Sequence, residues 1–264
     1  MVILSTDPSI RYILVDLDGT TFPTEGPLPE GFHENLSTFS GLIERANRGE
    51  FPKIGFCTGR ELNYVEGATR TLTLPDGWSV LENGLFIYNL ATGVRINHPL
   101  LTPEAKTVFQ NIRDRIWVVT YRFPDLEAYL KKEVHIALER RNRWINLAEY
   151  VAPIQEMFIE FKKQMDVVCS GHAIDLLVNG INKGSGLQEL CDWSGVSPKE
   201  VLIIGDSPND FPAMDLAGSI GCPSNADEKC KEFVRNKGGH VSLLPYVVGV
   251  VDIIKHYLPN AGQA

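Results

Sequence analysis

The sequence has few of the features that mark secreted, membrane-bound or nucleic-acid-binding proteins. It contains only five cysteines in 264 residues and no Cys-X-X-Cys pair, which argues against a disulfide scaffold or a thiolate zinc site and favours reduced thiols in the cytoplasm. The 25 lysines and arginines are outnumbered by 33 aspartates and glutamates. Without a basic surface there is no electrostatic reason to expect nucleic acid as a partner.

Long apolar runs are also missing. A membrane-spanning helix needs roughly 20 apolar residues, and the apolar stretch from Tyr246 to Leu258 is shorter and carries Asp252, Lys255 and His256. We expect it to form a final helix packed on a sheet. The N-terminus reaches Asp7 before any long apolar run, so we expect no signal peptide, no membrane partner and a cytoplasmic location.

Several common catalytic motifs do not occur. The chain has no GxSxG, no GxxxxGK[ST] and no HExxH, and Gly184-Ser185-Gly186 lacks the third glycine of a dinucleotide-binding loop. These absences argue against serine hydrolases, P-loop NTPases, zinc proteases and dinucleotide-dependent enzymes.

What the chain does contain is an alternation of short apolar runs and helical stretches. Continuous apolar runs, typical of buried parallel strands, lie at 12–16, 54–57 and 201–205. Helices are expected at about 34–49, 61–72, 184–194, 208–217 and 226–236. This order predicts an α/β domain built on a parallel sheet.

Residues 85–178 have a different pattern. Their apolar residues form amphipathic runs, and segments 166–170 and 173–177 are expected to be paired strands around Gly171-His172. Pro153 could kink a helix or separate two elements, and His172 could be structural or approach a substrate. The amphipathic runs are Leu126/Leu130/Val134 and Leu147/Val151/Ile154/Phe158.

Charge divides along the same boundary. Residues 85–178 hold 12 Lys+Arg and 11 Asp+Glu, a net +1, whereas the remainder holds 13 and 22, a net −9, which together make the −8 of the whole chain. The division is either a chance split of surface charge or the mark of an inserted unit. In the second case Arg140, Arg141 and Arg143 could face an anionic ligand.

Two aspartates follow the first expected strand directly, in the sequence Asp-Leu-Asp-Gly-Thr at 16–20. Gly19 permits the chain to turn, so both carboxylates can lie at the carboxyl edge of the sheet, where open α/β folds bind ligands. A cation such as Mg²⁺ would relieve their repulsion. A Ca²⁺ loop of the EF-hand kind is excluded because its sixth position is Thr21 instead of glycine, whereas an ordinary Asx turn stays open.

Three further polar clusters lie at strand ends. The sequence at 57–60 places a hydroxyl and free backbone N–H groups before a helix, which is either an anion site or a helix cap. Lys183 could reach a phosphate or be a solvated surface lysine. Asp206, in Gly-Asp-Ser-Pro-Asn-Asp at 205–210, could complete a metal site or belong to a capped helix start. Each cluster has an ordinary explanation, but their joint occurrence in this order does not.

In these four motifs the chain resembles the haloacid dehalogenase-like hydrolase superfamily. Glu82-Asn83-Gly84 and the segment 170–184 are similar to the Cof-like subgroup, which carries a C2-type cap. The resemblance implies an α/β fold with a Rossmann-like catalytic core at 1–84 and 179–264. An inserted α/β cap domain of the C2 type would then occupy 85–178, which agrees with the position of the insert inferred above.

The resemblance also implies roles for individual residues. Asp16 would be the nucleophile that forms an aspartyl-phosphate, and Asp18 the general acid and then the base. The substrate phosphate would be bound by Thr58, Gly59, Arg60, Lys183 and Asn209. The Mg²⁺ would be held by Asp16, Asp18 (through its backbone carbonyl), Asp206 and Asp210. This division of labour is physically reasonable, because an anionic nucleophile approaches a phosphate only when positive charge neutralises both.

The expected function is therefore a Mg²⁺-dependent phosphomonoesterase. Its substrate would be a small phosphorylated metabolite, either a sugar phosphate or a compound of the phosphoglycerate or phosphoglycolate type, and the protein a monomer or small homo-oligomer. One alternative is a phosphomutase of the same cap class, although segment 205–210 lacks the Gly-Gly-Asn-Asp pattern of those enzymes. Another is a non-catalytic phosphate-binding or phospho-acceptor module, which the presence of Asp18 and of a cap disfavours.

Overall fold

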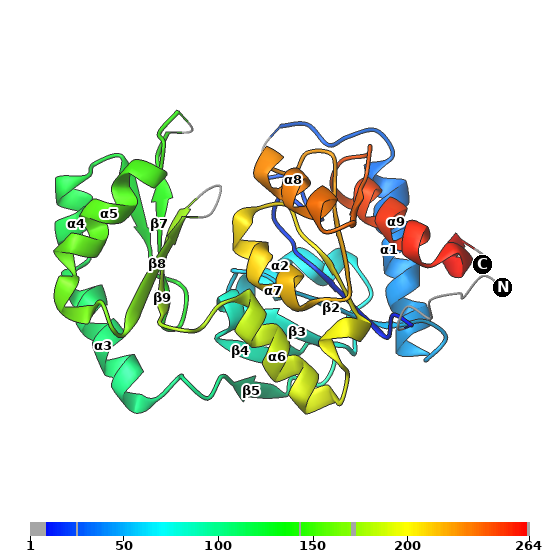
Figure 1. Cartoon of the computed structure of the whole chain (residues 1–264), viewed down its shortest axis with the longest axis horizontal. Coiled ribbons are helices and arrows are strands. Elements are labelled where there is room, and N and C mark those ends of the chain that lie inside the picture. Colours follow the sequence, from blue (N-terminus) through cyan, green and yellow to red (C-terminus); the bar gives the residue numbers. More distant parts are fainter. Residues whose placement is uncertain (1–8, 25, 143, 170–172, 263–264) are drawn as a thin grey trace.

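The computed structural model describes residues 9–24, 26–142, 144–169 and 173–262, and arranges them in two α/β units that lie side by side (Figure 1). The first unit is built on a parallel sheet with the strand order β12-β11-β10-β1-β2. The predicted α/β fold with a parallel sheet is confirmed. The strands are β1 (Tyr12–Val15), β2 (Lys53–Phe56), β10 (Val201–Ile204), β11 (Ser219–Cys222) and β12 (His240–Val241).

Helices cover both faces of this sheet. Successive side chains of a strand point to opposite faces, so Ile13 and Val15 share one apolar cluster with Phe39 of α1, while Leu14 shares another with Leu187 of α6. All four residues of β1 and all four of β10 are buried, which explains their continuous apolar sequences. The helices are α1 (Phe32–Asn47), α2 (Leu62–Ala68), α6 (Lys183–Ser194), α7 (Phe211–Leu216), α8 (Glu228–Asn236) and α9 (Tyr246–Tyr257).

The helices predicted from the sequence are confirmed. Two of them end or begin in a 3₁₀ turn: α2 continues into η1 (Thr69–Thr71), and η5 (Pro208–Asp210) precedes α7. None of the helices in the described part of the chain is long and apolar enough to cross a membrane. The other 3₁₀ turns are η2 (Glu82–Gly84), η3 (Ile159–Phe161), η4 (Pro198–Glu200) and η6 (Pro259–Gly262).

A small antiparallel sheet extends the first unit. It contains β3 (Trp78–Leu81), β4 (Phe86–Asn89) and β5 (Arg95–Asn97) in that order, and α6 packs against both β3 and β4. The predicted insert boundary at residue 85 falls between β3 and β4. Because β4 and β5 pair with β3, we propose that the inserted unit begins after β5.

The second unit is an antiparallel sheet with helices on one face. The strand order is β6-β7-β9-β8, and α3 (Pro103–Arg115), α4 (Trp117–Arg122) and α5 (Ala148–Met157) lie on the side remote from the first unit (Figure 1). The predicted strand pair is confirmed as β8 and β9, whereas Gly171 and His172 lie outside the described residues. The strands are β6 (Leu126–Tyr129), β7 (Ile136–Arg140), β8 (Met165–Cys169) and β9 (Ala173–Val178).

The two amphipathic runs of this unit form different structures. Leu126 begins strand β6, and Leu130 and Val134 lie in the connection to β7. The three residues are therefore part of a β-hairpin, although they are spaced four apart as in an amphipathic helix. In the second run, Val151 and Ile154 lie in α5 and Leu147 and Phe158 are its capping residues. Pro153 lies inside that helix without dividing it.

Candidate active site

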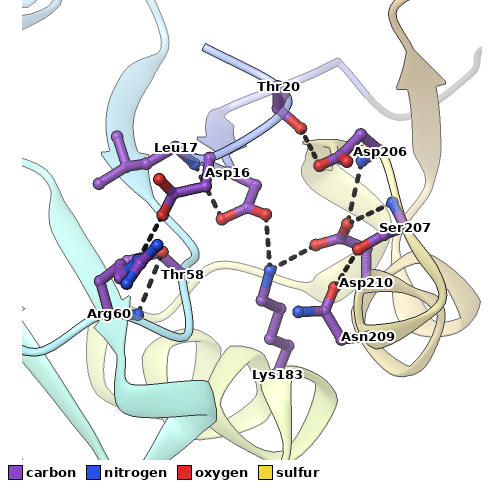
Figure 2. A network of polar contacts seen from close by, with 12 residues as sticks. Asp16, Leu17, Thr20, Thr58, Arg60, Lys183, Asp206, Ser207, Asn209 and Asp210 are labelled. Carbon is purple, nitrogen blue, oxygen red and sulfur yellow. Dashed lines mark hydrogen bonds and ion pairs between the residues drawn. The ribbon is translucent and has the colours of Figure 1, made fainter. Parts of the chain in front are cut away.

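The polar motifs meet at the carboxyl edge of the parallel sheet (Figure 2). Asp16 follows β1, Thr58 follows β2, Asp206 follows β10, and Lys183 is the first residue of α6. A cavity of about 310 Å³ lies above them, between the two units. Parallel strands that end at one edge thus bring together residues that are far apart in the sequence.

A buried ion pair lies at the centre of the site. The Nζ atom of Lys183 is 3.0 Å from Oδ2 of Asp16 and 2.6 Å from Oδ1 of Asp210, and the Lys183 side chain is fully buried. Burial lowers the pKa of Lys183, but the carboxylates of Asp16 and Asp210 outweigh this effect and raise that pKa well above its usual value. The lysine therefore remains a cation. Because its side chain is buried, Lys183 is not the solvated surface residue that the sequence also allowed.

Asp16 is an unusual carboxylate. Burial, and to a smaller extent the neighbouring Asp210 and Asp18, raise the pKa of Asp16 to about 7, against the lowering effect of Lys183. Its Oδ1 accepts a hydrogen bond of 2.8 Å from the backbone N–H of Leu17, which fixes the orientation of the side chain. The negative charge on Asp16 is therefore costly unless another cation approaches.

Three carboxylates form a cluster that could hold a metal ion. Oxygen atoms of Asp16, Asp206 and Asp210 all lie within 4.8 Å of one another. Burial raises the pKa of Asp206 well above its usual value, and repulsion from Asp16 and Asp210 adds to this. Oxygen ligands that repel one another in this way fit a hard divalent cation such as Mg²⁺.

The three members of the cluster are not equivalent. Asp210 accepts hydrogen bonds from the backbone N–H groups of Asp206 and Ser207, at 3.0 and 3.1 Å, in addition to contacting Lys183. Asp206 accepts one from the hydroxyl of Thr20, at 2.8 Å. Asp210 thus caps the turn after β10 while it orients the lysine, and Asp16 and Asp206 keep more free acceptor capacity for a metal.

Gly19 allows the loop after β1 to approach Asp206. Its φ is +78°, and a Cβ atom at this position would lie 2.5 Å from Oδ2 of Asp206. Only glycine fits both the left-handed backbone and the close contact. The Asp-Leu-Asp-Gly-Thr sequence is therefore more than a strand-end turn, since its glycine makes room for a carboxylate from another strand.

The turn after β2 does not cap α2. That helix begins at Leu62, its N-terminal capping position is Glu61, and no side chain caps it. Thr58 is buried, and its hydroxyl accepts the backbone N–H of Arg60 at 3.3 Å. Both Thr58 and Gly59 line the cavity, so the anion-site interpretation of this turn is favoured.

Two predicted phosphate ligands have other partners. Arg60 donates from Nε to Oδ2 of Asp18 at 2.7 Å, and Asn209 accepts the hydroxyl of Ser207 at 2.8 Å while lining the cavity. The second oxygen of Asp18 accepts the hydroxyl of Tyr64 at 2.6 Å. The Asp18 carboxylate is thereby held outside the three-carboxylate cluster, and Tyr64 is a neighbour that the sequence analysis missed.

The second unit supplies one wall of the cavity, which the sequence analysis assigned only in part. Ala137 of β7 is opposite Asp175 of β9, and Glu139 is opposite Ala173. Paired residues point to the same face, so these four side chains form a surface that faces the motifs. The second-unit residues that line the cavity are Lys132, Ala137, Glu139, Arg140, Ala173 and Asp175.

A second buried ion pair belongs to this wall. The Nζ atom of Lys132 is 2.7 Å from Oδ1 of Asp175, and the side chains are only 6% and 8% exposed. Asp175 is the one acidic residue in the otherwise apolar strand 173–178, and this was the sequence signal that could have indicated a buried ion pair. Of the predicted arginine cluster, Arg140 lines the cavity, Arg141 pairs with Glu127 at 3.8 Å, and Arg143 lies outside the described residues.

Comparison with known proteins finds hydrolases and phosphatases that are similar to this chain. A family model for haloacid dehalogenase-like hydrolases matches residues 125–240. Phosphoglycolate phosphatase of Methanothermobacter thermautotrophicus is 30% identical over 249 residues, which cover 94% of this chain and 99% of that protein. Phosphoglycolate phosphatase of Methanococcoides burtonii is 25% identical over 255 residues, which cover 95% and 98%.

Solved structures share the fold. Sucrose-phosphatase from Synechocystis sp. PCC6803, in complex with sucrose and phosphate, superposes with a TM-score of 0.68 at 20% identity and covers 94% of this chain and 98% of that one. A haloacid dehalogenase-like hydrolase from Bacteroides thetaiotaomicron superposes with a TM-score of 0.67 at 17% identity, covering 94% and 99%. Both support a Rossmann-like core combined with a second unit.

Proposed function

The chain belongs to the haloacid dehalogenase-like hydrolases and is a phosphatase, and from this premise we propose that it hydrolyses the phosphate monoester of a small polar metabolite through a covalent intermediate on Asp16. The observation that carries the proposal is the contact between the buried carboxylate of Asp16 and the buried ammonium of Lys183 at the edge of the cavity. A nucleophile and a fixed cation are thus adjacent where a phosphoryl group would bind.

In the first step an oxygen of Asp16 forms a bond to phosphorus. The bond between phosphorus and the alcohol oxygen breaks, its electron pair goes to that oxygen, and the oxygen takes a proton from Asp18. In the second step water attacks phosphorus and gives a proton to Asp18, and the bond between phosphorus and Asp16 breaks. Inorganic phosphate leaves, and both aspartates return to their starting states.

The chain's own residues stabilise the charge that develops. Lys183 contacts Asp16 directly, and the hydroxyl of Thr58 and the backbone N–H of Gly59, which both line the cavity, would donate hydrogen bonds to the equatorial oxygens of the phosphoryl group. We propose that Mg²⁺, held by Asp16, Asp206 and the backbone carbonyl of Asp18, supplies neutralising charge when bound. In this assignment Asp210 orients Lys183 and the turn after β10.

We propose that the substrate is small and that its leaving group is polar. The cavity has a volume of about 310 Å³, and the second unit contributes both signs of charge to it through Lys132, Asp175, Glu139 and Arg140. The relatives at 25–30% identity are phosphoglycolate phosphatases, so phosphoglycolate is the first compound to test, before sugar phosphates. We further propose that the second unit acts as a cap that excludes water from the site.

The experiment is phosphate release from a panel of phosphorylated metabolites and p-nitrophenyl phosphate, with Mg²⁺ and with a chelator. We expect Mg²⁺-dependent release that is lost in Asp16→Asn, which preserves the size of the side chain. Release that needs no divalent metal, or that persists in Asp16→Asn, would contradict the mechanism. Saturable turnover of phosphoglycolate at the highest kcat/KM of the panel would support the proposed substrate class.

A further inference from the structure

Arg60 occupies a junction between the catalytic loop and the second unit. Its Nε donates to Oδ2 of Asp18 at 2.7 Å, while its Nη1 atom lies 3.5 Å from Oε1 of Glu139 on β7. The guanidinium also stacks over the ring of Tyr64, with its carbon 4.6 Å from the ring centre. One side chain therefore contacts an acid of the catalytic motif and an acid of the opposite unit at the same time.

Both oxygens of the Asp18 carboxylate are engaged by this group. Oδ2 accepts Arg60, and Oδ1 accepts the hydroxyl of Tyr64 at 2.6 Å. The side chain of Asp18 is only 17% exposed. Two charge-assisted hydrogen bonds from different directions determine the orientation of the carboxylate, and the stacking of Arg60 on Tyr64 fixes the two donors relative to each other.

A second contact between the two units lies beside the one that Arg60 makes. Glu61, the next residue after Arg60, accepts the hydroxyl of Tyr129 at 2.6 Å. Tyr129 on β6 is opposite Ala137, and Glu139 lies two residues further along β7, so Tyr129 and Glu139 project from the same face of that sheet. Two consecutive residues of the first unit are thus bound to one face of the second.

We propose that Arg60 is a positioning residue for Asp18, acting together with Tyr64, and that its contact with Glu139 makes this position depend on how the second unit sits against the first. The inference rests on the proposed function, because it assigns Arg60 a part in the step that involves Asp18. It replaces the role expected from the sequence, in which Arg60 binds phosphate. Although Arg60 lines the cavity, its Nε and Nη1 atoms lie against the carboxylates of Asp18 and Glu139.

The test uses the leaving group of the substrate. An alkyl phosphate such as phosphoglycolate needs a proton on its departing oxygen, whereas p-nitrophenolate departs without one. In Arg60→Gln and in Tyr64→Phe we expect kcat/KM for the alkyl phosphate, which reports formation of the aspartyl-phosphate and not its shared hydrolysis, to fall about 10-fold or more relative to kcat/KM for p-nitrophenyl phosphate, as for a misplaced general acid. Inhibition by inorganic phosphate should stay within about twofold of wild type. Glu139→Gln should shift the ratio of kcat/KM values in the same direction by a smaller factor.

The matched control is Arg48→Gln, which removes an arginine that is paired with Glu44 and Glu50 on the exposed surface; it should leave both substrates unaffected. Equal losses on the two substrates together with weaker phosphate inhibition would overturn the proposal and assign Arg60 to phosphate binding. An unchanged ratio in Tyr64→Phe, which keeps the aromatic ring, would overturn it even if Arg60→Gln does not fold. A wild-type protein that hydrolyses neither substrate would instead refute the proposed function.

Discussion

The ammonium of Lys183 lies between two carboxylates, 3.0 Å from Asp16 and 2.6 Å from Asp210, with all three side chains buried. This relationship links stability to chemistry, because the same cation that would neutralise a phosphoryl group also compensates two buried acids. Removing one partner of such a group leaves an uncompensated charge in the interior.

We therefore expect Lys183→Met to abolish phosphatase activity and to lower the free energy of unfolding by about 3 kcal/mol. Adding Asp210→Asn to that variant should restore part of the stability, because one of the two unpaired carboxylates is removed, but no activity. Urea unfolding and phosphate release measure the two effects. A Lys183→Met variant as stable as wild type would contradict this account of the ion pair.

Metal binding is expected to depend on Asp206. Mg²⁺ should raise the melting temperature of the wild-type protein, since a ligand that binds only the folded state stabilises it. Asp206→Asn should lose most of this rise. The control is Asp114→Asn, which changes an exposed carboxylate that accepts a hydrogen bond from Gln110, and this variant should retain the rise. Thermal unfolding with and without Mg²⁺ measures the difference, and equal shifts in the two variants would exclude Asp206 as a ligand.

Two glycines separate the effect of backbone strain from the effect of a clash with Asp206. Gly19 and Gly26 have φ values of +78° and +82°, but an added Cβ atom meets Asp206 only at Gly19 and finds nothing within 4 Å at Gly26. Both alanine variants should lose about 1 kcal/mol of stability through backbone strain. Only Gly19→Ala should also lose Mg²⁺ affinity and activity. Equal activity of the two variants would show that the close approach to Asp206 is unimportant.

Glu82 predicts a specific dependence of stability on pH. Burial raises the pKa of Glu82 to about 7, although its hydrogen bond from the backbone of Glu133 lowers it in part. The folded state then holds a proton that the unfolded state has lost between about pH 4.5 and 7, so the contribution of Glu82 to stability falls as pH rises through this window.

Glu82→Gln should accordingly be more stable than wild type by about 2 kcal/mol above pH 7 and similar to it near pH 4.5. Denaturant unfolding at a series of pH values measures the difference. Glu127→Gln, on a side chain that is 65% exposed, provides the control. A difference between Glu82→Gln and wild type that does not change with pH would refute the assignment.

The catalytic motifs were predictable because each is local. A buried apolar run that ends in polar residues identifies a parallel strand, and all parallel strands of a sheet end at the same edge. Asp16 and Asp206 could therefore be brought together in the prediction without knowledge of the loops, whereas Lys183 begins α6 after β9 of the antiparallel sheet. The resemblance to a known family added their order along the chain.

The partners of these residues were not predictable in the same way. Arg60 follows a turn that the sequence analysis assigned to phosphate binding, yet its guanidinium contacts Asp18 and Glu139. Nothing local distinguishes an arginine that binds an anionic ligand from one that binds two acids. The proposed boundary after β5 depends likewise on the pairing of β4 with β3, which the amphipathic pattern does not encode.

The sequence by itself determined the parallel sheet, the strands at whose ends the acids lie and the order of the motifs, since these follow from burial and turn chemistry over a few residues. Only the tertiary structure decided which face of the second sheet meets the site and which side chains Arg60 and Lys132 contact. The physical reason is that strand register determines which alternate side chains share a face, and that register arises from pairing between segments far apart in the chain.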